Sequence, residues 1–161
     1  MKQVAWLLKN VLLPLTPFLV GALIRFVQAG KFSWECLSVT ELAFSMALMF
    51  LILTSSTTKI QDAALKNSLN SGFNFSVVVF IALFAVGLFL EADIQVSLQD
   101  FFATATSKLN ASQPLSLSDL PSAIARDQGI VARIRFITMS LSALSIILAV
   151  VVGIKYELMD S

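Results

Sequence analysis

Apolar residues concentrate in four runs along the chain, and polar segments separate them. The runs cover residues 10–24, 36–54, 73–90 and 136–154. The last two contain no charged residue. Each run is close to the ~20 residues that an α-helix needs to cross a ~30 Å hydrocarbon layer. The pattern predicts an all-α, polytopic membrane protein with four transmembrane helices, at about 7–27, 36–55, 73–90 and 136–154.

Two local features modify this pattern. Pro14 and Pro17 lie inside the first run, and each lacks a backbone donor, so we expect a kink between residues 13 and 18. The sequence SSTTKIQDAALKNSLNSG between the second and third runs is a polar connection, in which residues 61–69 can form one or two exposed helical turns. Its last three residues, 70–72, favour a turn, so we expect the third helix to begin after them.

The segment between the third and fourth runs, residues 91–135, is too long for a simple turn. Its apolar residues recur at three- and four-residue steps, the spacing of one helix face. They are Ile94, Leu98, Phe101, Phe102, Ala105 and Leu109 before the sequence NASQPLS, and Leu117, Leu120, Ile124, Val131 and Ile134 on its far side. We expect two amphipathic arms that form an extramembrane helical hairpin within a single domain, residues 1–161. Two short helices lying on the membrane surface are the alternative.

Composition narrows the function. Only 13% of the residues are charged, against about 25% in soluble domains. The net charge of +1 gives no electrostatic footprint for nucleic acid. The chain has one cysteine, Cys36, and no histidine, and it carries none of the common nucleotide, hydrolase or metal motifs. We therefore expect no catalysis, no cofactor, no metal site and no direct nucleic-acid binding.

Glu41 is the one acidic residue inside an apolar run. If the second helix begins at Cys36, Glu41 lies about five residues, or ~8 Å, inside it, with Trp34, Ser38 and Ser45 on the same stripe. Arg25 ends the first helix on the same side of the membrane, so an intramembrane Arg25–Glu41 ion pair is geometrically allowed. The alternatives are a glutamate extending to the interface and a transport carboxylate. The sequence shows no further polar groups in series that would support transport.

The fourth helix carries small and polar residues on one stripe, at three- and four-residue steps: Thr138, Ser142, Ser145, Ala149 and Gly153. Such faces mark close helix packing in membranes, either within the chain or between subunits of a homo-oligomer. Outside the membrane, the apolar residues of the arms are candidates for a partner surface or for packing within the hairpin. The candidates for the partner surface are Phe101, Phe102, Leu98 and Ile124.

The distribution of basic residues gives little help with orientation. The side that holds both termini has five lysines, and the hairpin side has six basic residues. The basic N-terminus favours both termini in the cytoplasm, in a bacterial inner membrane.

Three classes of function are compatible with these features. The first is a non-catalytic, oligomeric membrane scaffold or sensor, bound to the lipid bilayer, that recruits a separate soluble effector protein. The second is a small oligomeric channel, for which Thr138, Ser142 and Ser145 would line the pore. The third is a transporter, which the absence of an inverted repeat and of a midplane charge disfavours.

The order of the four runs carries one resemblance to a known family. In sequence they are NVLLPLTPFLVGALI, CLSVTELAFSMALMFLILT, FNFSVVVFIALFAVGLFL and FITMSLSALSIILAVVVGI. This layout resembles the membrane subunit of the Kiwa anti-phage defence system. The resemblance implies an oligomer that responds to phage at the envelope and holds a DNA-binding partner. It lies in the layout alone, so no residue role follows from it. Holins share such layouts, but this chain ends in KYELMDS rather than in a basic tail.

Overall fold

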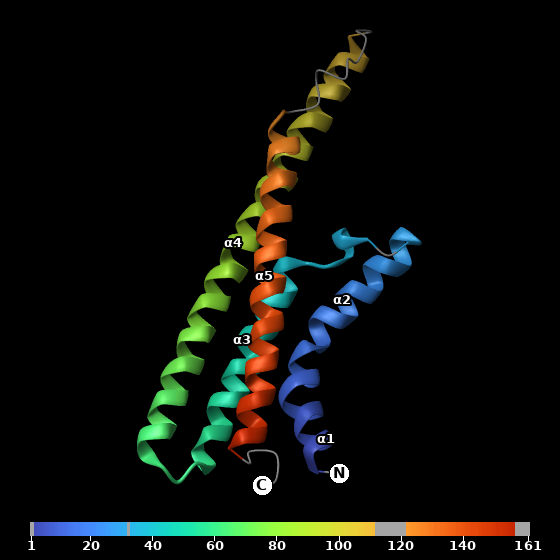
Figure 1. Ribbon diagram of the computed structural model, residues 1–161. Helices are drawn as coiled ribbons and strands as arrows, with labels where there is room; N and C mark the ends of the chain where they lie inside the picture. The colour runs from blue at the N-terminus through green and yellow to red at the C-terminus, as the bar shows by residue number, and fades with distance from the viewer. Residues whose placement is uncertain (1, 32, 112–121, 157–161) are drawn as a thin grey trace.

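The computed structural model describes residues 2–31, 33–111 and 122–156, and these are almost entirely helical, with no strand among them (Figure 1). Four helical segments are long and apolar enough to cross a membrane. They are Gln3–Ala29, Val39–Ser56, Ala63–Asn110 and Gly129–Lys155. The all-helical class and the four candidate spans therefore agree with the sequence pattern.

The first span consists of three consecutive helical segments. They are α1 (Lys2–Leu7), the π-helix η1 (Leu8–Leu12) and α2 (Leu13–Ala29). The span changes direction along this stretch (Figure 1). The irregularity begins a turn earlier than the expected kink, because the wide π-turn lies on the N-terminal side of Pro14, where the missing N–H leaves carbonyls without their usual donor.

The second span, α3 (Val39–Ser56), is the centre of the bundle. In the most apolar 18-residue stretch of α3, 56% of the residues are buried. The corresponding share in the first span is 17%. Phe50 packs its ring against Phe73 and Phe80 of α4, with ring centroids 5.8 and 5.9 Å apart. Packing against α2, α4 and α5 makes α3 the helix that holds the others together.

The third span belongs to α4 (Ala63–Asn110), a helix of 48 residues and about 72 Å. Its start corrects the expectation that the helix begins after Gly72. The Asp62 side chain caps it by accepting from the N–H groups of Ala64 and Leu65, at 2.9 and 3.2 Å. Asn70 accepts a hydrogen bond from Thr57, in the 3-10 helix η3 (Thr57–Lys59), so this polar residue is used by a tertiary contact and not by a turn.

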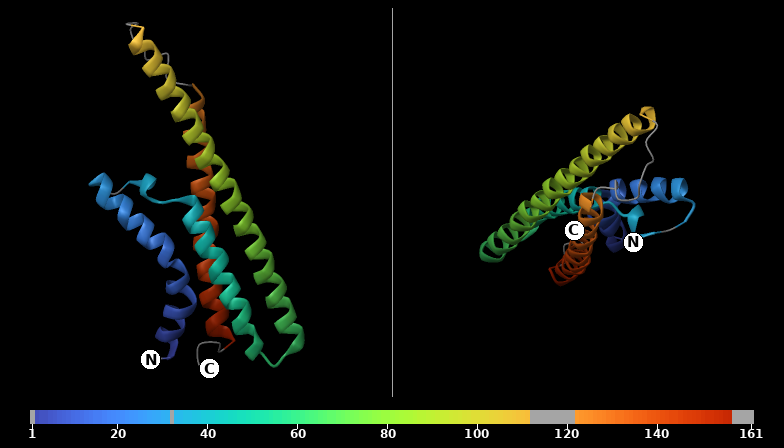
Figure 2. Two further views of the ribbon diagram at one scale, coloured as in Figure 1. Left: turned by 180° about the vertical axis from the view of Figure 1, so that it is seen from behind. Right: turned by 90° about the horizontal axis from the view of Figure 1, so that it is seen from above.

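Both α4 and α5 (Ser122–Lys155) continue well beyond their apolar runs (Figure 1). The two arms are not packed along their whole length, because the upper end of α4 leans away from α5 in the view from above (Figure 2). Consequently Leu98, Phe102 and Leu109 of α4 are exposed, at 38%, 63% and 62%. The linker of the hairpin, residues 112–121, lies outside the described residues.

The small-residue stripe of α5 is buried within the chain. Thr138, Ser142 and Ala149 are at most 3% exposed, Gly153 is buried, and Ser145 is half-buried. Packing within the chain, one of the two alternatives, therefore already uses most of this stripe. These residues therefore do not form an open polar face for a central pore or a second subunit.

The beginning of α1, the end of α5 and the α3–α4 connection lie at one end of the bundle (Figures 1 and 2). The hairpin extends from the other end. The parts of the chain that the sequence places on one side of a membrane are therefore together in space.

Candidate functional site

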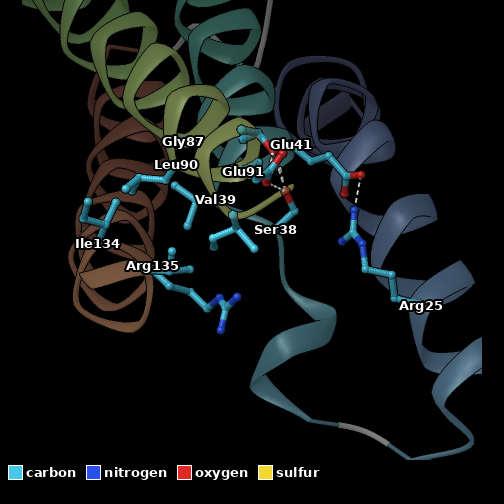
Figure 3. A pocket seen from close by; sticks show the side chains of 12 residues that line it. Arg25, Ser38, Val39, Glu41, Gly87, Leu90, Glu91, Ile134 and Arg135 are labelled. Carbon is cyan, nitrogen blue, oxygen red and sulfur yellow. Dashed lines mark hydrogen bonds and ion pairs between the residues drawn. The ribbon is translucent and has the colours of Figure 1, made fainter. Parts of the chain in front are cut away.

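Each of the four spans contributes one charged residue to a cavity of ≈ 320 Å³ at the base of the hairpin (Figure 3). These residues are Arg25 of α2, Glu41 of α3, Glu91 of α4 and Arg135 of α5. Arg135 and Glu91 lie next to the apolar runs of their helices, directly before Phe136 and after Leu90. The cavity is therefore at the boundary between the apolar part of the bundle and its projecting arms.

Arg25 and Glu41 form an ion pair across α2 and α3, with each side chain 32% exposed. The Arg25 guanidinium also donates a hydrogen bond of 2.9 Å to the backbone carbonyl of Cys36. The two residues that the sequence suggested as partners are thus brought together. Their contact joins the end of the first span to the segment that leads into α3.

Glu41 lies in the first turn of α3, closer to the helix end than the sequence suggested. The helix begins at Val39, and the Ser38 hydroxyl oxygen accepts a 3.4 Å hydrogen bond from the Glu41 N–H as its N-cap. Trp34 belongs to the separate 3-10 helix η2 (Trp34–Cys36), so it shares no helical stripe with Glu41. The Ser38–Glu41 spacing is the capping-box spacing, a signal that the sequence analysis did not use.

Glu91 and Arg135 are members of the site that were not predicted from the sequence. The Glu91 carboxylate accepts hydrogen bonds from the hydroxyls of Thr40, at 2.9 Å, and Ser38, at 3.4 Å. A negative charge at this point faces the positive end of the α3 macrodipole. One turn earlier, Gly87 allows α4 to approach closely, because a β-carbon there would lie 2.8 Å from the Thr40 side chain. In the sequence, this contact is indicated only by a glycine and a glutamate four residues apart at the end of an apolar run, Gly87 and Glu91.

Arg135 has no partner within the described residues. Its Nε is buried without a hydrogen bond, and its side chain points into the cavity, not towards Glu41 or Glu91 (Figure 3). One oxygen of Glu41, Oε2, is likewise buried without a donor. The site therefore contains one ion pair with an unused carboxylate oxygen, one carboxylate held by hydroxyls, and one arginine with no partner among the described residues.

Below the cavity, three hydroxyl groups are buried in the bundle without a partner. They belong to Ser45 of α3 and to Thr138 and Ser142 of α5. Several other helical hydroxyls donate to a carbonyl in the preceding turn; those of Thr54 and Ser76 do so to Phe50 and Gly72, at 2.9 and 3.0 Å. The sequence indicated no polar groups in series with Glu41, and within the described residues none of these hydroxyls forms a hydrogen bond with it. They lie on α3 and α5, two helices that pack together.

The structure separates the four candidates for a partner surface. Leu98 and Phe102 are exposed on α4, whereas the neighbouring Phe101 is half-buried and contacts the Phe102 ring edge-on, with centroids 5.8 Å apart. Ile124 is in α5, but its side chain lies outside the described residues. The described surface is therefore a stripe of α4 alone.

Among the described residues, no group of three or more His, Cys, Asp or Glu side chains is placed to hold a metal ion. Comparisons with known proteins add no relative: no family model, no curated protein and no solved structure matches the chain.

Proposed function

We propose that this chain is a non-catalytic integral membrane scaffold that binds a separate protein through the α4 arm of its hairpin. The four apolar helical segments support insertion in a bilayer. The cytoplasmic location of both termini, the bacterial inner membrane and a role in anti-phage defence are parts of the proposal that rest on the sequence layout.

One observation carries the proposal: the face of α4 that packs on α3 continues beyond the end of α3. Gly87 and Glu91 contact the first turn of α3. Leu98, Phe102 and Leu109 follow on the same face at helical spacing, and all three are exposed. An apolar helix face that extends into water is costly unless a partner covers it.

The geometry also suggests what kind of partner would fit. On this face of α4, α3 covers the part up to Glu91. A helix with an apolar stripe could pack in the same way on the part beyond Glu91, as amphipathic helices do in other complexes. We therefore propose an amphipathic helix of a separate protein as the element that binds Leu98, Phe102 and Leu109.

Oligomerisation is included in the proposal, with a different contact from the one the sequence suggested. Most of the small-residue stripe of α5 is already buried in the chain. In the first span, by contrast, only 17% of the residues in the most apolar stretch are buried. We place the contact between copies on the outer face of α2. We favour the scaffold over the channel alternative, because two of the three residues suggested to line a pore, Thr138 and Ser142, lie in the interior of one chain.

The test is a pull-down of the full-length protein from its own membranes in mild detergent, followed by native mass measurement and mass spectrometry. Variants Leu98→Ser and Phe102→Ser should lose a co-purifying protein that the wild type carries in fixed ratio. Val96→Ser is the matched control, since Val96 is 56% exposed but lies on the opposite face of α4. Equal loss in the control variant, or no loss in the other two, would contradict the proposal.

Insertion and orientation can be tested in the same material. Cys36, the only cysteine, is buried, so single cysteines at exposed positions can be labelled selectively. We expect Val96→Cys and Gln61→Cys to react from opposite sides of the membrane, and the protein to resist alkaline extraction. Reaction of both from one side would contradict the four-span arrangement.

A further inference from the structure

The cavity at the base of the hairpin contains a cation that nothing in the described chain neutralises. Arg135 makes no ion pair or hydrogen bond with residues 2–31, 33–111 or 122–156, and its Nε is buried. An arginine in a partly buried position normally has an anionic partner, because its desolvation is otherwise uncompensated. Its planar guanidinium matches the geometry of phosphate or carboxylate oxygens.

Neither carboxylate of the cavity pairs with Arg135. Glu41 is paired with Arg25, and the Oε1 atom of Glu91 is held by the hydroxyls of Thr40 and Ser38. The second oxygen of Glu91 has no donor within the described residues, and the side chain is exposed to the cavity. The cavity thus offers an unpaired cation on α5 and an available anion on α4.

The charges of the cavity balance, since two arginines and two glutamates sum to zero. A ligand with a single net charge would leave the cavity charged, whereas a zwitterion would satisfy both free groups and keep it neutral. We propose that this cavity binds the headgroup of an amine-bearing phospholipid, with the phosphate on Arg135 and the ammonium group on Glu91.

The position of the cavity favours a lipid over a soluble zwitterion. Arg135 directly precedes the apolar run 136–154, and Glu91 directly follows the run 73–90, so both lie at the predicted headgroup level. Apolar side chains complete the wall, including those of Leu90 and Ile134. The volume of ≈ 320 Å³ is within the about 300–1,000 Å³ of small-ligand sites.

The test measures lipid retention by the purified full-length protein in detergent, using native mass spectrometry. The probes are phosphatidylethanolamine, phosphatidylglycerol and free phosphoethanolamine. We expect the wild type to retain phosphatidylethanolamine in preference to phosphatidylglycerol. Arg135→Gln should weaken retention by about tenfold or more, the effect of losing a charge-assisted hydrogen bond. Glu91→Gln should abolish the preference between the two lipids.

Two further variants make the outcome decisive. Arg133→Gln removes an exposed arginine two residues away that does not line this cavity, so it should leave retention unchanged. Arg135→Lys keeps the charge and should retain more lipid than Arg135→Gln, which separates ligand binding from misfolding. Unchanged retention in Arg135→Gln, or equal losses in the Arg133 and Arg135 variants, would overturn the proposal. Competition by free phosphoethanolamine at equal concentration would overturn the lipid assignment.

The inference rests on membrane insertion, which belongs to the proposed function, but not on the protein partner. A protein that loses its partner in Phe102→Ser and still retains lipid separates the two proposals. Failure of lipid binding in a protein that resists alkaline extraction would count against this inference alone.

Discussion

The Glu41 carboxylate lies directly against Gly21 of α2, in the space that a β-carbon at position 21 would occupy. The pairing of Glu41 with Arg25, one turn further along α2, holds it there. We predict that Gly21→Ala displaces the carboxylate and weakens the ion pair, at a cost of about 1 kcal/mol in the free energy of unfolding, relative to alanine at a helical glycine without this contact. Thermal or denaturant unfolding in detergent measures this change.

Gly72→Ala is the matched control for that substitution. Gly72 is helical and exposed, and a β-carbon there would meet nothing within 4 Å. Alanine should therefore leave the protein equally stable, or stabilise it by up to about 1 kcal/mol through helix propensity. Equal effects at positions 21 and 72 would show that the Glu41 contact does not constrain α2.

Gly87 tests the close approach of α3 and α4 beneath the cavity. A β-carbon at this position would lie 2.8 Å from the Thr40 side chain and 3.4 Å from that of Val39. We expect Gly87→Ala to separate the helices and to destabilise the protein by about 1–3 kcal/mol. Gly129→Ala in α5, where a β-carbon meets nothing, should have no such effect. A neutral result at Gly87 would mean that the two helices can shift freely.

The Arg25–Glu41 pair is suited to a double-mutant cycle. We expect Arg25→Ala to destabilise more than Glu41→Gln, because Arg25 also donates to the Cys36 carbonyl. The coupling energy between the two substitutions should be about 1 kcal/mol, since both side chains are partly exposed. Additive effects on the unfolding free energy would show that the pair contributes nothing beyond its separate contacts.

For the buried hydroxyls of α5 we predict that substitution does not lower the free energy of unfolding. The Thr138 hydroxyl has no partner, so Thr138→Val, which replaces it with a methyl group, should leave stability unchanged or raise it. Thr54→Val is the control, because it removes a 2.9 Å hydrogen bond to the Phe50 carbonyl and should cost about 1 kcal/mol. A clear loss of stability in Thr138→Val would indicate that a water molecule or ion binds this hydroxyl.

Much of the fold could be predicted from the sequence, because apolar runs of this length leave few alternatives to spanning helices. Helix ends were harder to predict. The residues 70–72 look like a turn in isolation, but Asn70 is used by Thr57, and the helix continues through Gly72. The start of α3 was set three residues too early, since the Ser38 cap and not the apolar run determines it.

The site was only partly predictable. Arg25 and Glu41 could be paired because Arg25 follows the first apolar run and Glu41 lies near the start of the second, on the same side of the predicted membrane. Glu91 was missed because its role depends on the hydroxyls of Ser38 and Thr40, more than fifty residues away in the chain, and no local pattern encodes that contact. The α5 stripe was recognised as a packing face, but only the three-dimensional arrangement shows that the chain itself covers it.

The length of α4 has a mechanical consequence. One uninterrupted helix joins the connection at the terminal end of the bundle to the end of the projecting arm, and α3 packs against its first half, from Phe73 to Glu91. The half beyond Glu91 is therefore a cantilever, fixed at its base and unsupported by α3 along its length. A tilt of about ten degrees at Glu91 would move its end by about 5 Å. A load on the end of the arm would act directly on the contacts of Gly87 and Glu91 with Thr40 at its base.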